Sequence, residues 1–247
     1  MRAFLSIVLL AFAAALAPAA QAQPGVQKPL RVLFIGNSLT FWTDIPKRVA
    51  RVAAAMGRQA QFETATYPGY SLEDHWRDGR ALEAIRKGGW DLVVMQQGTS
   101  AHDAGRAELI EYSRRFAKPI RDAGAKPALY MVWPPQDQLK DFPDAIQSYR
   151  MAAKEIDALL IPAGEAWLRA LNKDPRLRLF SDSIHPSSFG SDIASLTIYL
   201  SLFPAGPQEF DEAFVAKVAK ALEIPADRRD LFFDAATLAI DSPLAIK

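Results

Sequence analysis

The chain contains no cysteine and only three histidines among its 247 residues. Without cysteine the fold can form no disulfide, and the scattered histidines offer no ligand set for a structural zinc site. Basic and acidic residues nearly balance, at 29 and 28, which leaves a net charge of +1 and none of the basic excess typical of nucleic-acid-binding proteins. Half of the residues are apolar, enough for one well-packed core.

Long apolar runs are also scarce, and the clearest one lies at the start of the chain. Arg2 precedes an uncharged apolar stretch over residues 4–16, and Ala20-Gln21-Ala22 supplies the small-x-small pattern of a signal peptidase site. The stretch is shorter than the roughly 20 residues that span a bilayer. We therefore expect residues 1–22 to be a signal peptide, and residues 23–247 to form a single secreted or periplasmic domain without a stable membrane anchor.

Beyond residue 23, short apolar segments alternate with amphipathic ones along the whole chain. Such alternation is typical of βαβ units, which build a parallel sheet covered by helices on both faces. Strands are expected at 30–35, 62–67, 91–95, 128–133 and 159–161, and helices at 45–56, 72–87, 108–123, 144–156, 164–171 and 189–203.

The first candidate for chemistry is Ser38, which directly follows the first expected strand in the segment Gly36-Asn37-Ser38-Leu39-Thr40. Ligands of parallel sheets bind outside the carboxyl ends of the strands. A helix N-terminus close by also favours a developing negative charge. A serine in such a turn can equally serve as a simple helix cap, so its position alone does not establish a nucleophile.

The second candidate is the pair Asp182 and His185, in a loop before the apolar helix expected at 189–203. A carboxylate beside an imidazole fixes its tautomer and stabilises the imidazolium that forms when it accepts a proton. His75 lies beside a tryptophan in an expected helix, where a packed role is more common. His102, in a polar loop after the third strand, could approach the pocket, but no carboxylate is placed to orient it as neatly. His185 is therefore the favoured base for Ser38.

These residues carry a family resemblance. Gly36-Asn37-Ser38-Leu39 closely resembles the GDSL block of the SGNH hydrolase superfamily, with Asn37 where the family usually has Asp. Asp182 and His185 resemble its last block. Gly69, in Tyr67-Pro68-Gly69-Tyr70, resembles the second block, whose glycine amide serves the oxyanion hole. The three blocks occur in the family's order and cover nearly the whole of residues 23–247.

The third block departs from the family pattern. Family members commonly carry Gly-x-Asn after the third strand, whereas this chain has Gln96-Gln97-Gly98-Thr99-Ser100. A strict alignment puts Ser100 at the Asn position. Gln-Gly also resembles a block of acetyl-sugar esterases in the superfamily, where Gln replaces Asn. The amide of Gln has the same NH₂ donor on a longer arm, so Gln97, with Gln96 close behind, is the favoured side-chain donor to the oxyanion.

The resemblance implies a three-layer α/β/α fold, with five parallel strands in the flavodoxin-like order 2-1-3-4-5. It also implies a serine esterase with the triad Ser38, His185 and Asp182, and an oxyanion hole from the Ser38 and Gly69 amides. The implied reaction needs neither a metal nor a cofactor. Asn37, Trp42 and Trp133 are expected to line the substrate pocket. The expected substrate is a short-acyl ester, acetyl first, of a carbohydrate or similar alcohol. A lipase, arylesterase or thioesterase, an acyltransferase and a non-catalytic binding module remain alternatives.

Overall fold

The computed structural model describes residues 28–204 and 210–246. The expected signal peptide, residues 1–22, lies outside the described residues. Within these ranges five parallel strands form one sheet in the order β2-β1-β3-β4-β5, which confirms the predicted flavodoxin-like topology. The strands are β1 (Leu30–Gly36), β2 (Ala60–Thr66), β3 (Leu92–Met95), β4 (Lys126–Tyr130) and β5 (Leu159–Ile161).

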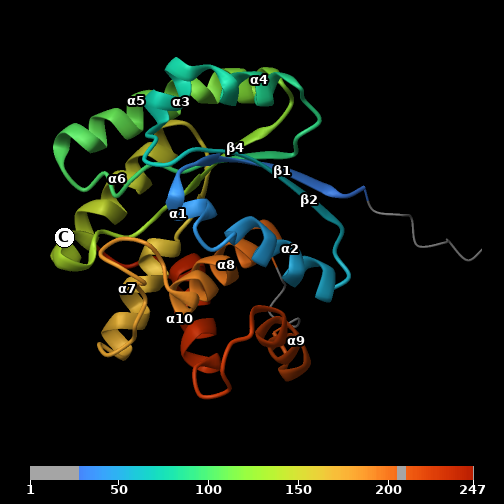
Figure 1. Ribbon diagram of the computed structural model, residues 1–247, viewed down its shortest axis with the longest axis vertical. Helices are drawn as coiled ribbons and strands as arrows, with labels where there is room; N and C mark the ends of the chain where they lie inside the picture. Colours follow the sequence, from blue (N-terminus) through green and yellow to red (C-terminus); the bar gives the residue numbers. More distant parts are fainter. Residues whose placement is uncertain (1–27, 205–209, 247) are drawn as a thin grey trace, which may run out of the picture.

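Helices cover both faces of the sheet, as Figure 1 shows. One layer contains α3 (Leu72–Asp78), α4 (Arg80–Arg86), α5 (Asp103–Asp122) and α6 (Phe142–Glu155). The other contains α2 (Ile45–Ala55), α7 (Ala163–Lys173), α8 (Ser188–Leu202), α9 (Glu212–Leu222) and α10 (Arg229–Asp241). The predicted α/β/α sandwich is therefore confirmed.

The central strands and α8 have the composition of elements that are buried on several sides. Residues 32–36 of β1 and 93–95 of β3 are all buried, which explains their continuous apolar sequence. α8 is also apolar over most of its surface, because α2, α7 and α10 all pack around it. These elements form a rigid base beneath the loops at the carboxyl ends of the strands.

Three predicted elements differ clearly from the structure. The single helix expected at 72–87 is two helices, because Gly79 adopts a left-handed conformation (φ 84°) between α3 and α4. β4 ends at Tyr130 rather than at residue 133, although Met131, Val132 and Trp133 stay buried. α5 begins at Asp103, five residues before the predicted start.

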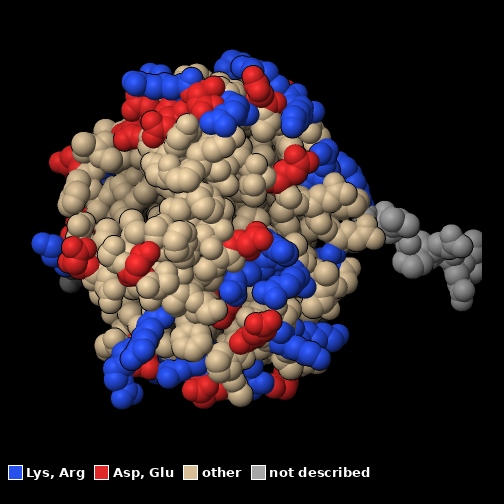
Figure 2. All heavy atoms as spheres, viewed as in Figure 1, with Lys and Arg blue, Asp and Glu red and all other residues tan. Residues whose placement is uncertain are grey.

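Charged side chains of both signs are mixed on the face drawn in Figure 2. They gather toward its upper and lower edges and in a mainly basic group right of its centre. Uncharged side chains cover most of the area between, so this face carries no continuous basic strip. No helix in the described ranges combines the length and apolarity needed to cross a bilayer.

Candidate active site

Ser38 is the first residue of α1 (Ser38–Phe41), a single helical turn that directly follows β1. Asn37 caps this turn: its side-chain oxygen accepts a hydrogen bond from the amide of Leu39 (3.0 Å). The Asn37 amide group donates to the backbone carbonyl of Tyr70 (3.0 Å), in the loop after β2. The cap therefore joins the turn that carries Ser38 to the loop that carries Gly69.

Gln96, at the carboxyl end of β3, supports the same turn from beneath. Its side-chain oxygen accepts hydrogen bonds from the backbone amide of Asn37 and from the Thr40 hydroxyl, both at 2.9 Å. Gly36 leaves room for this contact, since a Cβ at residue 36 would lie 2.5 Å from the Gln96 oxygen. Gly36, which has no side chain, and the side-chain oxygen of Gln96 together fix the position of Ser38.

The structure brings Ser38, His185 and Asp182 together. His185 Nε2 lies 2.9 Å from Ser38 Oγ, and His185 Nδ1 lies 2.7 Å from an Asp182 carboxylate oxygen. A carboxylate only accepts hydrogen bonds, so the proton of neutral His185 is on Nδ1, and Nε2 is free to accept from the serine. This is the arrangement in which an imidazole can take the proton of a hydroxyl.

Asp182 is held as an anion by the loop around it. Its second oxygen accepts from the amides of Ile184 (2.8 Å) and His185 (2.7 Å). Hydrogen bonds lower the pKa of Asp182 to about 2. The largest contribution comes from the Ile184 amide, followed by the His185 amide and the His185 ring. The carboxylate of Asp182 therefore stays charged down to strongly acidic pH.

Trp133 does not line this surface. The side chain is fully buried, its ring stacks on Trp167 with centroids 3.5 Å apart, and its indole N–H donates to the Ile184 carbonyl (2.9 Å). The expected substrate contact does not fit Trp133, because neither face of the ring is open. The structure instead gives it a supporting role, since it holds the loop that carries His185.

Trp42 is different, because 52% of its surface is exposed. Its ring stacks on the imidazole of His185, with centroids 4.1 Å apart and planes 16° from parallel. Sequence reasoning expected this tryptophan near the site but did not anticipate a contact with the base.

The amide groups of Gln96 and Gln97 are both engaged in hydrogen bonds. Gln96 Nε2 donates to the Asn37 side chain (3.0 Å) and the Gln97 carbonyl (2.5 Å). Gln97 Nε2 donates to the Ser100 hydroxyl (3.2 Å), while its oxygen accepts from the Leu72 amide (3.1 Å). The Leu72 contact places Gln97 beside the loop after β2, which also contains Gly69 in a left-handed conformation (φ 71°).

The other two histidines lie outside this constellation. His75 is fully buried, and its Nε2 donates to the Gly36 carbonyl (2.8 Å); burial lowers its pKa. His102 has a largely exposed ring, 3.8 Å from the carboxylate of Asp141. Among the described residues no group of three His, Asp or Glu side chains is arranged to hold a metal ion.

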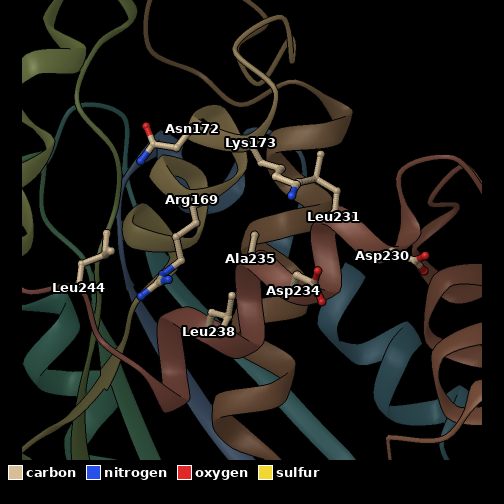
Figure 3. A pocket seen from close by; sticks show the side chains of 9 residues that line it. All are labelled: Arg169, Asn172, Lys173, Asp230, Leu231, Asp234, Ala235, Leu238 and Leu244. Atoms are coloured by element: carbon tan, nitrogen blue, oxygen red, sulfur yellow. The ribbon is translucent and has the colours of Figure 1, made fainter.

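A separate cavity of about 580 Å³ lies between α7 and α10. Figure 3 shows side chains of the two helices and Leu244 around it, and no predicted site residue is among them. Its walls mix charged and apolar groups. The cavity offers no serine–histidine pair, so the constellation around Ser38 remains the candidate active site.

No protein-family model matches the chain, and no curated protein matches it in sequence. Solved structures do resemble it. A candidate SGNH hydrolase from Slackia heliotrinireducens is 25% identical, with a TM-score of 0.61 over 71% of this chain and 100% of its own. A DUF4886 family protein from Bacteroides uniformis ATCC 8492 is 19% identical, with a TM-score of 0.65 over 89% of this chain and 98% of its own.

A catalytic mutant of Axe2, an acetylxylan esterase from Geobacillus stearothermophilus, is 16% identical, with a TM-score of 0.54 over 70% of this chain and 94% of its own. These similarities, the strand order and the serine at the carboxyl end of β1 define a three-layer α/β/α protein of the hydrolase type. The chain therefore has the fold of the SGNH hydrolase superfamily.

Proposed function

We propose that this protein is a serine esterase in which Ser38, His185 and Asp182 form the catalytic triad. The observation that carries the proposal is the hydrogen-bonded series from Ser38 Oγ through His185 to Asp182, at 2.9 and 2.7 Å. Structural neighbours described as SGNH hydrolases, lipases and acetylxylan esterases support ester bonds as the target.

The proposed reaction follows from these positions. His185 Nε2 takes the proton of Ser38 as Oγ attacks the ester carbonyl, and the tetrahedral oxyanion accepts from the Ser38 and Gly69 amides and a Gln97 amide proton. Gln97 must turn its NH₂ away from Ser100 to do this. His185 then protonates the leaving alcohol, and water, activated by the same imidazole, releases the acid and restores Ser38.

We further propose a short acyl group, acetyl first, on a carbohydrate or similar alcohol. The Gln-Gly segment after β3 and the similarity in fold to acetylxylan esterases support this choice. The expected leader implies export, with cleavage after Ala22. Intact-mass measurement of exported protein tests this, because retention of residues 1–22 would contradict a secreted or periplasmic location.

The triad is tested with purified mature protein on p-nitrophenyl esters of increasing acyl length. Ser38→Ala and His185→Ala should each lower kcat by about 10⁴-fold or more, and Asp182→Ala somewhat less, because triad members act as a unit. His102→Ala is the matched control, since that ring is exposed and is expected to leave the rate unchanged. Full activity of Ser38→Ala would overturn the proposal, and a preference for long acyl chains would favour a lipase.

A further inference from the structure

Trp42 is joined to both the nucleophile and the base. It closes the helical turn that Ser38 begins, and its amide donates to the Ser38 carbonyl (2.8 Å). Its indole ring covers a face of the His185 imidazole at 4.1 Å. One helical turn therefore carries the proposed nucleophile and also the ring that packs on the proposed base.

The contacts of His185 show what this stacking adds. Asp182 holds Nδ1 and Ser38 holds Nε2, so the two hydrogen bonds fix opposite edges of the ring. Two bonds at opposite edges still leave the imidazole free to tilt about the line that joins them. A flat ring only 16° from parallel restrains that tilt, because tilting pushes one edge of the imidazole into the indole.

The stacking also has an electrostatic consequence. The face of an indole carries negative charge, so a cation centred over it is stabilised. His185 becomes a cation each time it takes the proton of Ser38. The indole therefore interacts more strongly with the imidazolium of the transition state than with the neutral ring of the resting enzyme.

From these contacts we propose that Trp42 is a positioning residue, which holds the His185 ring in line between Asp182 and Ser38 and stabilises its protonated form. This inference rests on the proposed triad. Core packing does not explain the residue, because about half of its surface is exposed (52%). A platform for a substrate sugar is the competing role, and it makes a different kinetic prediction.

Trp42→Leu is the informative variant, because leucine keeps an apolar cover over the imidazole but removes the aromatic face. We expect kcat on p-nitrophenyl acetate to fall about tenfold while KM changes less than twofold. The acid limb of the kcat/KM profile should move to lower pH by about 0.4–0.7 units. This shift is the free energy of an exposed cation–π contact converted to pH units. Asp182 is the ionisable group bonded to the ring, and it is the same in both proteins.

Trp42→Phe restores an aromatic face and should recover most of the rate and the wild-type pH profile. Leu238→Ala on α10 is the matched control for loss of an exposed apolar side chain (46% exposed), and should behave as wild type. A raised KM with an unchanged kcat in Trp42→Leu would overturn the positioning role and favour the sugar platform.

Proton NMR of the three histidines separates this inference from the proposed function, because it needs no turnover. In Trp42→Leu, the His185 ring signals should move as ring-current shielding is lost, and their titration midpoint should fall in step with the kinetic profile. Unchanged signals and an unchanged midpoint would refute the stacking role even in an active enzyme. An inactive wild type with shifted His185 signals would instead refute the esterase and leave the contact established.

Discussion

Gln96 and Gln97 are neighbours in sequence, yet their amides serve different parts of the molecule. Adjacent residues of an extended segment point to opposite sides. Gln96 accordingly braces the turn of Ser38, through Asn37 and Thr40. Gln97 points toward Leu72 and Ser100, beside the Gly69 loop. The two residues should therefore differ in what their loss does to the protein.

Gln97→Ala should lower kcat by about 10²- to 10³-fold with little change in KM, the usual loss for one oxyanion donor. Gln96→Ala should instead cost about 1–3 kcal/mol of stability, because it leaves the buried Asn37 amide and Thr40 hydroxyl without their acceptor. Steady-state kinetics and urea unfolding of both variants separate the roles. If Ser100→Ala is costly and Gln97→Ala mild, the serine is the donor and the Gln assignment is wrong.

Asp182 gives the site a defined response to acid. Its pKa in the folded protein, about 2, is below the ordinary 3.8. A carboxyl with a depressed pKa contributes stability above its unfolded pKa, and that contribution is lost as the pH falls toward 2. The melting temperature of the wild type should therefore fall more steeply between pH 4 and pH 2 than that of Asp182→Asn. Parallel slopes for the two proteins would contradict the hydrogen-bonded carboxylate.

At the scale of elements, strand positions were predictable because buried parallel strands are short apolar runs that end at glycine or polar residues. β1, β3 and β5 match their predicted ranges within one or two residues. Helix ends were less predictable. The helical pattern over 72–87 continues through Gly79, and nothing in the apolar spacing reveals that this glycine turns left-handed. For the same reason, the apolar spacing did not predict the short 3₁₀ helix η1 (Gln136–Asp141).

The end of β1 offers a test of how the strand positions the nucleophile. Gly36→Ala would place a Cβ 2.5 Å from the Gln96 oxygen and 2.8 Å from the Thr40 hydroxyl. We expect a stability loss of about 1–3 kcal/mol from overpacking, and reduced activity as Gln96 is displaced. Gly98→Ala is the control, because a Cβ there meets no atom within 4 Å. Equal effects of the two substitutions on unfolding would contradict this role for residue 36.

At the scale of the whole molecule, the candidate catalytic residues were predictable from their chemistry, whereas the packing around them was not. Ser38 was predicted because sites form at the carboxyl ends of parallel strands, and His185 because a nucleophilic serine needs a base. The structure places the two side chains in contact, although 147 residues separate them in the sequence. The stack of Trp42 on His185 and the burial of Trp133 depend on the packing of distant segments. No local pattern contains that information, so one tryptophan expected at the pocket belongs to the supporting structure behind it.

The C-terminal segment is attached to the domain through Glu165, a fully buried carboxylate on α7. It accepts hydrogen bonds from Arg150 on α6 (2.6 Å), from Arg169 (3.0 Å) and from the Leu244 amide (2.8 Å). Arg150 also donates to the Leu244 carbonyl (2.7 Å). One carboxylate thus joins α6, α7 and the C-terminal segment, and two guanidinium groups neutralise its negative charge.

Glu165→Gln should remove about 2–4 kcal/mol from the free energy of unfolding, because two partly buried arginines lose their counter-charge and one acceptor becomes a donor. Urea unfolding measures the loss. Glu155→Gln is the matched control: its pair with Arg114 is exposed on both sides, and such pairs contribute less than about 1 kcal/mol. The cluster lies outside the candidate active site, so Glu165→Gln should keep the wild-type kcat below its unfolding transition. A loss no larger than that of Glu155→Gln would mean that the C-terminal segment is held by its apolar contacts instead.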